Sequence, residues 1–188
     1  MILQNLKFLR NFFLLGAVVL FSQCNTEEPE PENEEELITT LEMVFESVDG
    51  SETVTFRLYD EDGDGPIEPV VTNGSLSANT DYNVEIEVRN DIENEDITEE
   101  VSEEALEHQF FFTIANGLNL DFAYDDADED GNPIGIESTF STGDASNGSL
   151  TVELRHEPNK SAAGAVDGDP ANAGGETDIQ ATFTVVIE

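Results

Sequence analysis

Residues 82–89 read Tyr82-Asn83-Val84-Glu85-Ile86-Glu87-Val88-Arg89, with an apolar side chain at every second position as far as Val88. Successive side chains of an extended strand point to opposite faces, so this alternation predicts a strand with one buried face and one solvated face. A strand of this kind is stable only beside similar strands, and the surrounding sequence supplies them.

The same alternation recurs in seven other segments of the chain. They are Leu37–Phe45, Val54–Leu58, Phe110–Ile114, Leu118–Tyr124, Ile134–Phe140, Leu150–Leu154 and Ile179–Ile187. Only Ile97–Leu106 has helical character, and Pro158–Glu176 is rich in Gly, Ala and Asp, which predicts an exposed loop.

Four dipeptides that favour tight turns stand between or beside these segments. They are Asp49-Gly50, Asn73-Gly74, Asn116-Gly117 and Asn147-Gly148. Asn-Gly and Asp-Gly supply the positive φ angles that hairpin turns require. Residues 37–188 are therefore predicted to form an all-β domain, an immunoglobulin-like antiparallel β-sandwich of about seven or eight strands.

The composition is strongly acidic, with 43 Asp and Glu against 6 Lys and Arg and a formal net charge of −37. Such a field repels the phosphate backbone and excludes a nucleic-acid binder. The single Cys excludes a disulfide within the chain. The charge has two interpretations, because it fits metal binding and also fits a protein kept soluble in a salty medium.

Residues 1–23 have the features of a secretory signal. Lys7 and Arg10 precede ten apolar residues at positions 12–21, a run too short for a membrane-spanning helix of roughly 20 residues. The only Cys, Cys24, follows at once and resembles the lipidated Cys of a bacterial lipobox. The resemblance implies a lipid anchor to the membrane at Cys24; the alternative is an ordinary secreted protein with a free thiol.

Residues 24–36 contain acidic residues and two prolines but no core-forming side chain, which predicts a disordered tether. Acidic clusters directly after the lipidated Cys resemble the surface-export signal of Bacteroidota lipoproteins. The implied location is the outer membrane or the cell surface. The alternative is that the stretch serves only as a spacer.

Two acidic loops have the D-x-D-x-D-G pattern of a calcium loop. The second continues to a Glu at position 12, which completes the EF-hand-type spacing. Oxygen atoms at positions 1, 3, 5, 7 and 12 of such a loop converge on one calcium ion. The candidate ligands of this second loop are Asp126, Asp128, Asp130, Asn132 and Glu137.

The first loop offers Asp60, Asp62, Asp64 and Glu68, but it has Val71 at position 12. Both loops follow a predicted strand rather than a helix, which resembles the calcium loops of some extracellular β proteins. The alternative is a pair of acidic hairpin turns without an ion. Calcium is the predicted cofactor, and added calcium is expected to raise the melting temperature.

The two loops also belong to an internal repeat in the sequence. Tyr59-Asp60 and Tyr124-Asp125 each open an acidic loop, and Asn-Gly-Ser-Leu follows both, at 73–76 and at 147–150. This repetition predicts two similar strand–loop–strand units. Convergent turn chemistry is the alternative explanation.

His108 and His156 are the only histidines of the chain, and each is next to a Glu. Imidazole and carboxylate groups bind zinc or copper, so the two histidines form a possible second metal site if their strand ends meet. The alternative is two unrelated surface histidines. No nucleophile motif or phosphate loop is present, so no enzyme is predicted.

Several segments resemble a family of small flavobacterial lipoproteins, some of which carry the label of a type 1 periplasmic binding fold. These segments are Glu107–Phe112, Tyr124–Gly135, Arg155–Ala162 and Gly174–Ile179. That label denotes a two-lobed α/β fold, whereas the alternation here predicts an all-β domain. The resemblance implies an envelope location and no reaction.

Together these features predict a lipid-anchored envelope or surface lipoprotein with a calcium-stabilised β-sandwich that binds a protein or small-molecule partner. The runner-up is a lipoprotein that captures a solute or a transition metal for a transporter through His108 and His156. A plain adhesion or surface-coat module is the third possibility.

Overall fold

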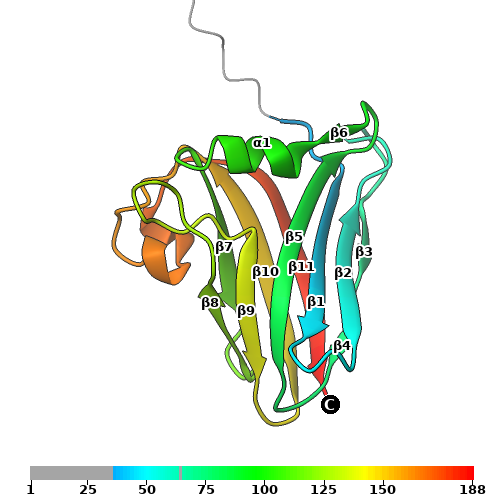
Figure 1. The fold of residues 1–188 in the computed structure, drawn as a ribbon. Helices are drawn as coiled ribbons and strands as arrows, with labels where there is room; N and C mark the ends of the chain where they lie inside the picture. Colours follow the sequence, from blue (N-terminus) through cyan, green and yellow to red (C-terminus); the bar gives the residue numbers. More distant parts are fainter. Residues whose placement is uncertain (1–35, 64) are drawn as a thin grey trace, which may run out of the picture. The chain divides into compact units, whose positions relative to one another are not determined.

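The computed structural model describes residues 36–63 and 65–188, and these residues form an all-β fold. Two sheets enclose one main apolar core, so the predicted antiparallel sandwich is confirmed (Figure 1). Each of the eight predicted segments overlaps one strand. The predicted signal segment, Cys24 and the tether as far as residue 35 lie outside the described residues, as does Asp64.

The first sheet has the strand order β3-β2-β1-β5-β9-β8, and the short strand β6 pairs with β5. All its pairings are antiparallel. Its strands are β1 (Thr40–Ser47), β2 (Thr53–Tyr59), β3 (Val70–Thr72), β5 (Asp81–Asn90), β6 (Glu95–Asp96), β8 (Leu120–Tyr124) and β9 (Glu137–Thr142).

The second sheet has the order β4-β11-β10-β7. Its long strands pair antiparallel, and only the two-residue strand β4 runs parallel to its neighbour β11. Its strands are β4 (Ser75–Leu76), β7 (His108–Ile114), β10 (Ser146–His156) and β11 (Glu176–Ile187).

The predicted alternation places the apolar side chains between the sheets. Aromatic rings join the two layers: Phe56 of β2 contacts Phe183 of β11, with ring centroids 5.5 Å apart, and Phe112 of β7 contacts Phe140 of β9 at 5.3 Å. Phe56, Phe140 and Phe183 are fully buried. Each buried Phe side chain stabilises the fold by about 1.5–3 kcal/mol relative to an exposed one.

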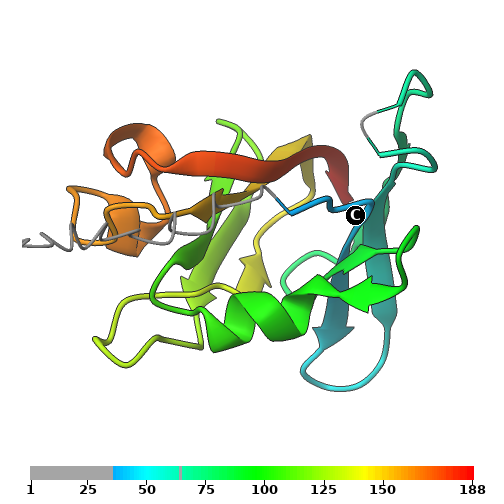
Figure 2. The ribbon, with the colours of Figure 1, turned by 90° about the horizontal axis from the view of Figure 1, so that it is seen from above.

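Helix α1 (Ile97–Glu103) confirms the predicted helical segment and lies across one end of the sheets (Figure 1). Asp96 caps the helix by accepting a hydrogen bond from the Thr98 amide. Ile97 and Val101 are buried in the core between the sheets. In Figure 2, which looks from above, this end of the sandwich faces the viewer with α1 across it.

The internal repeat in the sequence corresponds to two similar strand–loop–strand units. The loop at 60–69 joins the antiparallel neighbours β2 and β3, and the loop at 125–136 joins the antiparallel neighbours β8 and β9. In both units the Asn-Gly-Ser-Leu sequence reaches the other sheet, where its last two residues form β4 in the first unit and all four lie within β10 in the second. β4 pairs parallel and β10 antiparallel with β11. The predicted strand–loop–strand arrangement is therefore present twice.

Two of the four predicted turns are wrong, because neither Asn73-Gly74 nor Asn147-Gly148 forms a turn with a positive φ. Gly50 has a φ of +71° in the hairpin between β1 and β2, and Gly117 has a φ of +97° in the turn between β7 and β8, which belong to different sheets. Asn147-Gly148 instead lies inside β10, where Gly148 is opposite Val185 of β11. A Cβ at Gly148 would lie 2.9 Å from the Cβ of Leu118, so this glycine serves close packing rather than a turn.

The segment 158–176 is less exposed than predicted. It contains two short 3-10 turns, η1 (Ala165–Asp167) and η2 (Pro170–Asn172), and it lies beside β7 (Figure 1). Ala165 and Ala173 pack with Phe111 of β7 in a second small apolar cluster. The small side chains of the segment permit this close approach, which composition alone did not reveal.

Candidate metal centre

The two histidines lie side by side although they are far apart in the sequence. His108 is the first residue of β7 and His156 is the last residue of β10, and the antiparallel register makes them direct neighbours. Their rings stack, with centroids 4.7 Å apart and planes inclined by 16°. Both are buried, with 2% of His108 and 7% of His156 exposed.

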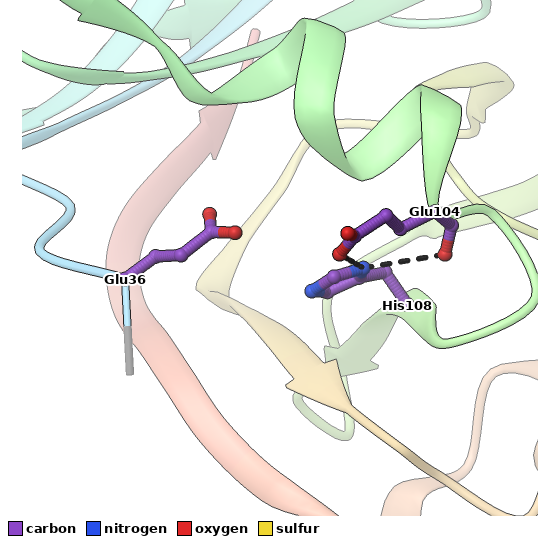
Figure 3. A group of neighbouring side chains, drawn as sticks. All are labelled: Glu36, Glu104 and His108. Carbon is purple, nitrogen blue, oxygen red and sulfur yellow. Dashed lines mark hydrogen bonds and ion pairs between the residues drawn. The ribbon is translucent and has the colours of Figure 1, made fainter. Parts of the chain in front are cut away.

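His108 belongs to a group of three metal-ligating side chains, which we call the His108 cluster: Glu36, Glu104 and His108. One ligand atom from each lies within 4.8 Å of the others, and both carboxylates face the imidazole (Figure 3). Nδ1 of His108 lies 3.3 Å from the main-chain oxygen of Glu104 and 4.0 Å from its Oε2.

Two stretches of the chain bring the His108 cluster together. Glu36 precedes β1, Glu104 is the C-terminal cap of α1, and His108 follows one turn later at the start of β7. The hydrogen bond from the Glu107 amide to the Glu104 carbonyl closes this turn. The buried side chains of α1 hold the helix end, and with it Glu104, over the strand ends.

His156 belongs to a second group, which we call the His156 cluster: Glu107, His156 and Glu157. Its ligand atoms also lie within 4.8 Å of one another, and His156 Nε2 is 3.6 Å from Oε2 of Glu107. The Glu157 amide donates to the Glu107 carbonyl at 2.6 Å. Glu157 has a φ of +49°, a value uncommon for a residue with a side chain.

Burial and neighbouring charges alter the protonation of the His108 cluster. Burial lowers the pKa of His108 below its ordinary value, and the nearby His156 lowers it further. Burial, followed by the charge of Glu100, raises the pKa of Glu36 to about 8. His108 is therefore neutral at pH 7, the form that binds a metal, and the raised pKa of Glu36 means that a cation beside this carboxyl would favour its ionised form.

The sequence singled out His108 and His156 with the adjacent Glu107 and Glu157, and the structure places all four at one end of β7 and β10. The sequence pattern did not indicate Glu36 or Glu104. The contact of Glu104 with His108 could have been predicted, because Glu104 lies four residues before His108 at a helix end. The contact of Glu36 could not have been predicted, because only the folded chain brings residue 36 near residue 108.

In the acidic loop between β8 and β9, backbone amides donate hydrogen bonds to two of the carboxylates. The carboxylate of Asp126 accepts hydrogen bonds from the amides of Gly135 at 2.7 Å and Glu137 at 3.0 Å. Oδ1 of Asp128 accepts from the amides of Asp130 at 3.1 Å and Asn132 at 2.8 Å. Asp130 and Glu137 are exposed.

A lysine occupies the remaining polar side of this loop. Nζ of Lys160 lies 3.0 Å from Oδ2 of Asp128 and 3.1 Å from the Pro133 carbonyl oxygen, and it also donates to the Ala105 carbonyl. The side chains of Asp128 and Lys160 are 0% and 5% exposed. Burial alone would raise the pKa of Asp128, but the bond from Lys160 holds it below its usual value.

The acidic loop between β2 and β3 is more open. Oδ1 of Asp60 accepts from the Asp62 amide at 3.2 Å, and Oδ2 of Asp62 accepts from the Ile67 amide at 3.2 Å. The other oxygen of Asp62 is buried and has no hydrogen-bond partner within the described part of the chain. Glu68 is exposed, and Asp64 lies outside the described residues. Calcium binding at either loop stays a prediction.

Comparisons of this chain with protein-family models, with curated proteins and with solved structures find no match. Among the described residues, no helix has the length and apolar character needed to cross a membrane.

Proposed function

We propose that this chain is a lipid-anchored protein of the cell envelope whose β-sandwich captures a divalent transition-metal ion at the His108 cluster. The observation that carries the proposal is the convergence of one buried imidazole and two carboxylates within 4.8 Å, with Glu36 brought to the turn that holds Glu104 and His108. This choice favours metal capture over the calcium-stabilised module that the sequence predicted first.

The donor set of the cluster fits a zinc-type ion. Imidazole nitrogen together with carboxylate oxygen suits zinc and its neighbours in the first transition row, whereas calcium prefers oxygen alone. Three protein ligands leave a fourth tetrahedral position for water or for a receiving partner. Ligands of one zinc ion lie roughly 3.4 Å apart, so the ligand atoms need to move only slightly from their present separation.

Glu36 supplies a second reason to expect a cation. Its Oε2 atom is buried and has no hydrogen-bond partner within the described chain. A buried carboxylate oxygen without a partner costs free energy, and a metal bond removes that cost. A bound ion would also offset the charges of Glu100 and Glu104, which together with burial raise the pKa of Glu36.

The envelope location is supported by the basic and apolar segment before Cys24, by the lipobox-like position of that Cys and by the resemblance to small flavobacterial lipoproteins. Attachment through two or three acyl chains would hold the domain firmly at a membrane. Mass spectrometry of the mature amino terminus tests this part, because a first residue other than an acylated Cys24 would refute it.

Zinc competition against a chromophoric chelator tests the metal part. Glu104→Gln should weaken zinc binding by tenfold or more, because it removes a ligand oxygen while keeping the size of the side chain. Glu103→Gln is the matched control, since it removes the same charge from the exposed neighbouring residue. Equal weakening in both variants would mean that zinc responds only to the general acidic field.

A calcium-stabilised interaction module is the second candidate. It is favoured by the buried oxygen of Asp62 that has no hydrogen-bond partner among the described residues. In that case millimolar calcium should raise the melting temperature, and Asp62→Asn should abolish the rise. The same melting curve with calcium and with a chelator would eliminate this candidate.

A further inference from the structure

The His156 cluster lies next to the His108 cluster but shares no residue with it. Glu107 and Glu157 come from the residues just before β7 and just after β10, and the hydrogen bond from the Glu157 amide to the Glu107 carbonyl holds the two segments together. His156 therefore has two carboxylates of its own, within 4.8 Å of its ligand atom.

The stacked rings are arranged so that one ion cannot readily be shared. The lone pair of an imidazole nitrogen lies in the plane of its ring, so a metal bound to that nitrogen lies near the same plane. The planes of His108 and His156 are inclined by only 16° in a stacked pair. Two such planes do not meet close to the rings, and a common ion would require one ring to leave the stack.

We infer that the His156 cluster is a second transition-metal site, so that the domain holds two ions side by side rather than one ion between its two histidines. The choice of a transition metal rests on the proposed function, but the ligands are different residues. The juxtaposition that carries the inference is Glu107, His156 and Glu157 within 4.8 Å, beside a stacked His108 that faces its own carboxylates.

The second cluster is open to solvent on one side. The Glu107 side chain is 57% exposed and Glu157 is also exposed, whereas only 9% of the His156 side chain is exposed. A hydrated ion can therefore reach the carboxylates first and then exchange a water for the imidazole. In the first cluster Glu104 is exposed as well but Glu36 is partly buried, so an ion there should exchange more slowly.

Two divalent ions on neighbouring rings repel each other. The second ion should therefore bind more weakly than the first, with a step between the two affinities that shrinks when salt screens the repulsion. One ion shared between the histidines would give a single affinity.

The number of bound ions decides between these arrangements. The full-length protein is loaded with Zn²⁺ or Co²⁺ at physiological salt, freed of weakly held metal by gel filtration and measured by native mass spectrometry. His108→Ala and His156→Ala are examined separately, and the double variant gives the background of the acidic surface. We expect two ions above background in the wild type and one in each single variant.

No bound ion in the wild type would overturn both the proposed function and the inference, and two ions in either single variant would overturn the site of the replaced histidine. One ion in the wild type and none in either single variant would mean a shared ion and would overturn the inference. One ion that is lost only with His108→Ala would overturn the inference and keep the proposed function. One ion that is lost only with His156→Ala would keep the second site and overturn the first.

Substitutions of exposed residues test the second site even if the alanine variants of the buried histidines fail to fold. Glu157→Gln alters an exposed side chain and should release the second ion alone. Glu95→Gln removes an equal charge from exposed β6, which belongs to neither cluster, and should retain both ions. Loss of an ion from Glu95→Gln would show that binding reflects net charge and would refute the second site.

Discussion

Lys160 supplies a positive charge to the second acidic loop, where a metal ion was predicted. Its ammonium group contacts one carboxylate oxygen and two carbonyl oxygens in a buried position. These are the types of oxygen that surround calcium in a loop of this sequence pattern. The second acidic loop is therefore held by a cation that belongs to the chain itself.

Replacing this lysine should destabilise the domain. Lys160→Met keeps the length of the side chain but leaves the buried Asp128 carboxylate without its charged partner, which costs about 3–5 kcal/mol. Urea denaturation followed by circular dichroism measures the loss. The double variant Lys160→Met/Asp128→Leu should recover much of it, and a single variant within about 1 kcal/mol of wild type would contradict the prediction.

The sequence revealed residue chemistry better than residue partnerships. His108 and His156 were recognisable because histidine is rare here and each stands beside a Glu. The contact of Lys160 with Asp128 was not, because it depends on how the segment 158–176 packs against the loop at 125–136. Long-range contacts of this kind leave no spacing pattern in a single sequence.

At the level of elements, alternation identified the long strands and missed the short ones. β3, β4 and β6 contain two or three residues each, too few for a period of two to be recognised. The Asn-Gly rule identified a turn at Asn116-Gly117 and failed at Asn73-Gly74 and Asn147-Gly148. Local turn chemistry cannot distinguish a glycine chosen for its φ angle from one chosen for its lack of a side chain.

Gly148→Ala tests the packing role of this glycine. The added Cβ would lie 2.9 Å from the Cβ of Leu118, so β10 or Leu118 must shift, and we expect a loss of about 1–3 kcal/mol in the free energy of unfolding. Thermal unfolding measures it. Asn147→Ala, on the exposed face of the same strand, is the control and should change stability by less than about 0.5 kcal/mol.

At the level of the whole molecule, negative charge far exceeds what the ion pairs can neutralise. Arg57 and Arg89 both contact Glu42, Arg155 contacts Glu153, and Lys160 contacts Asp128. These four are all the basic Lys and Arg residues after position 10, against 43 acidic residues in the chain. Most carboxylates therefore repel their neighbours without compensation.

Sodium chloride should stabilise this domain. At 0.1 M the Debye length is about 10 Å, so added salt weakens repulsion between carboxylates on separate strands more than it weakens buried pairs. Each kcal/mol of relieved repulsion raises the melting temperature by about 2–4 °C in a domain of this size. Calorimetry between low and high salt, with a chelator present, measures the effect, and a falling melting temperature would contradict it.

The sequence predicted the class of fold but not its strand order. Eight strands with the same alternation can pair in many ways, and nothing within one strand specifies its neighbour. The order is decided by which side chains fit between the layers, such as Phe56 with Phe183. The metal clusters depend on that order, because only the pairing of β7 with β10 brings His108 to His156.

The scarcity of basic residues has a consequence for digestion. Trypsin-like proteases cleave after Lys or Arg, and they need several residues of accessible, extended chain. After the amino-terminal segment such cuts are possible only at Arg57, Arg89, Arg155 and Lys160, of which the arginines lie within β2, β5 and β10 and the lysine is buried. A folded domain with these positions gives such an enzyme no exposed loop to cut, so it should resist trypsin-like proteases for as long as its sheets stay closed.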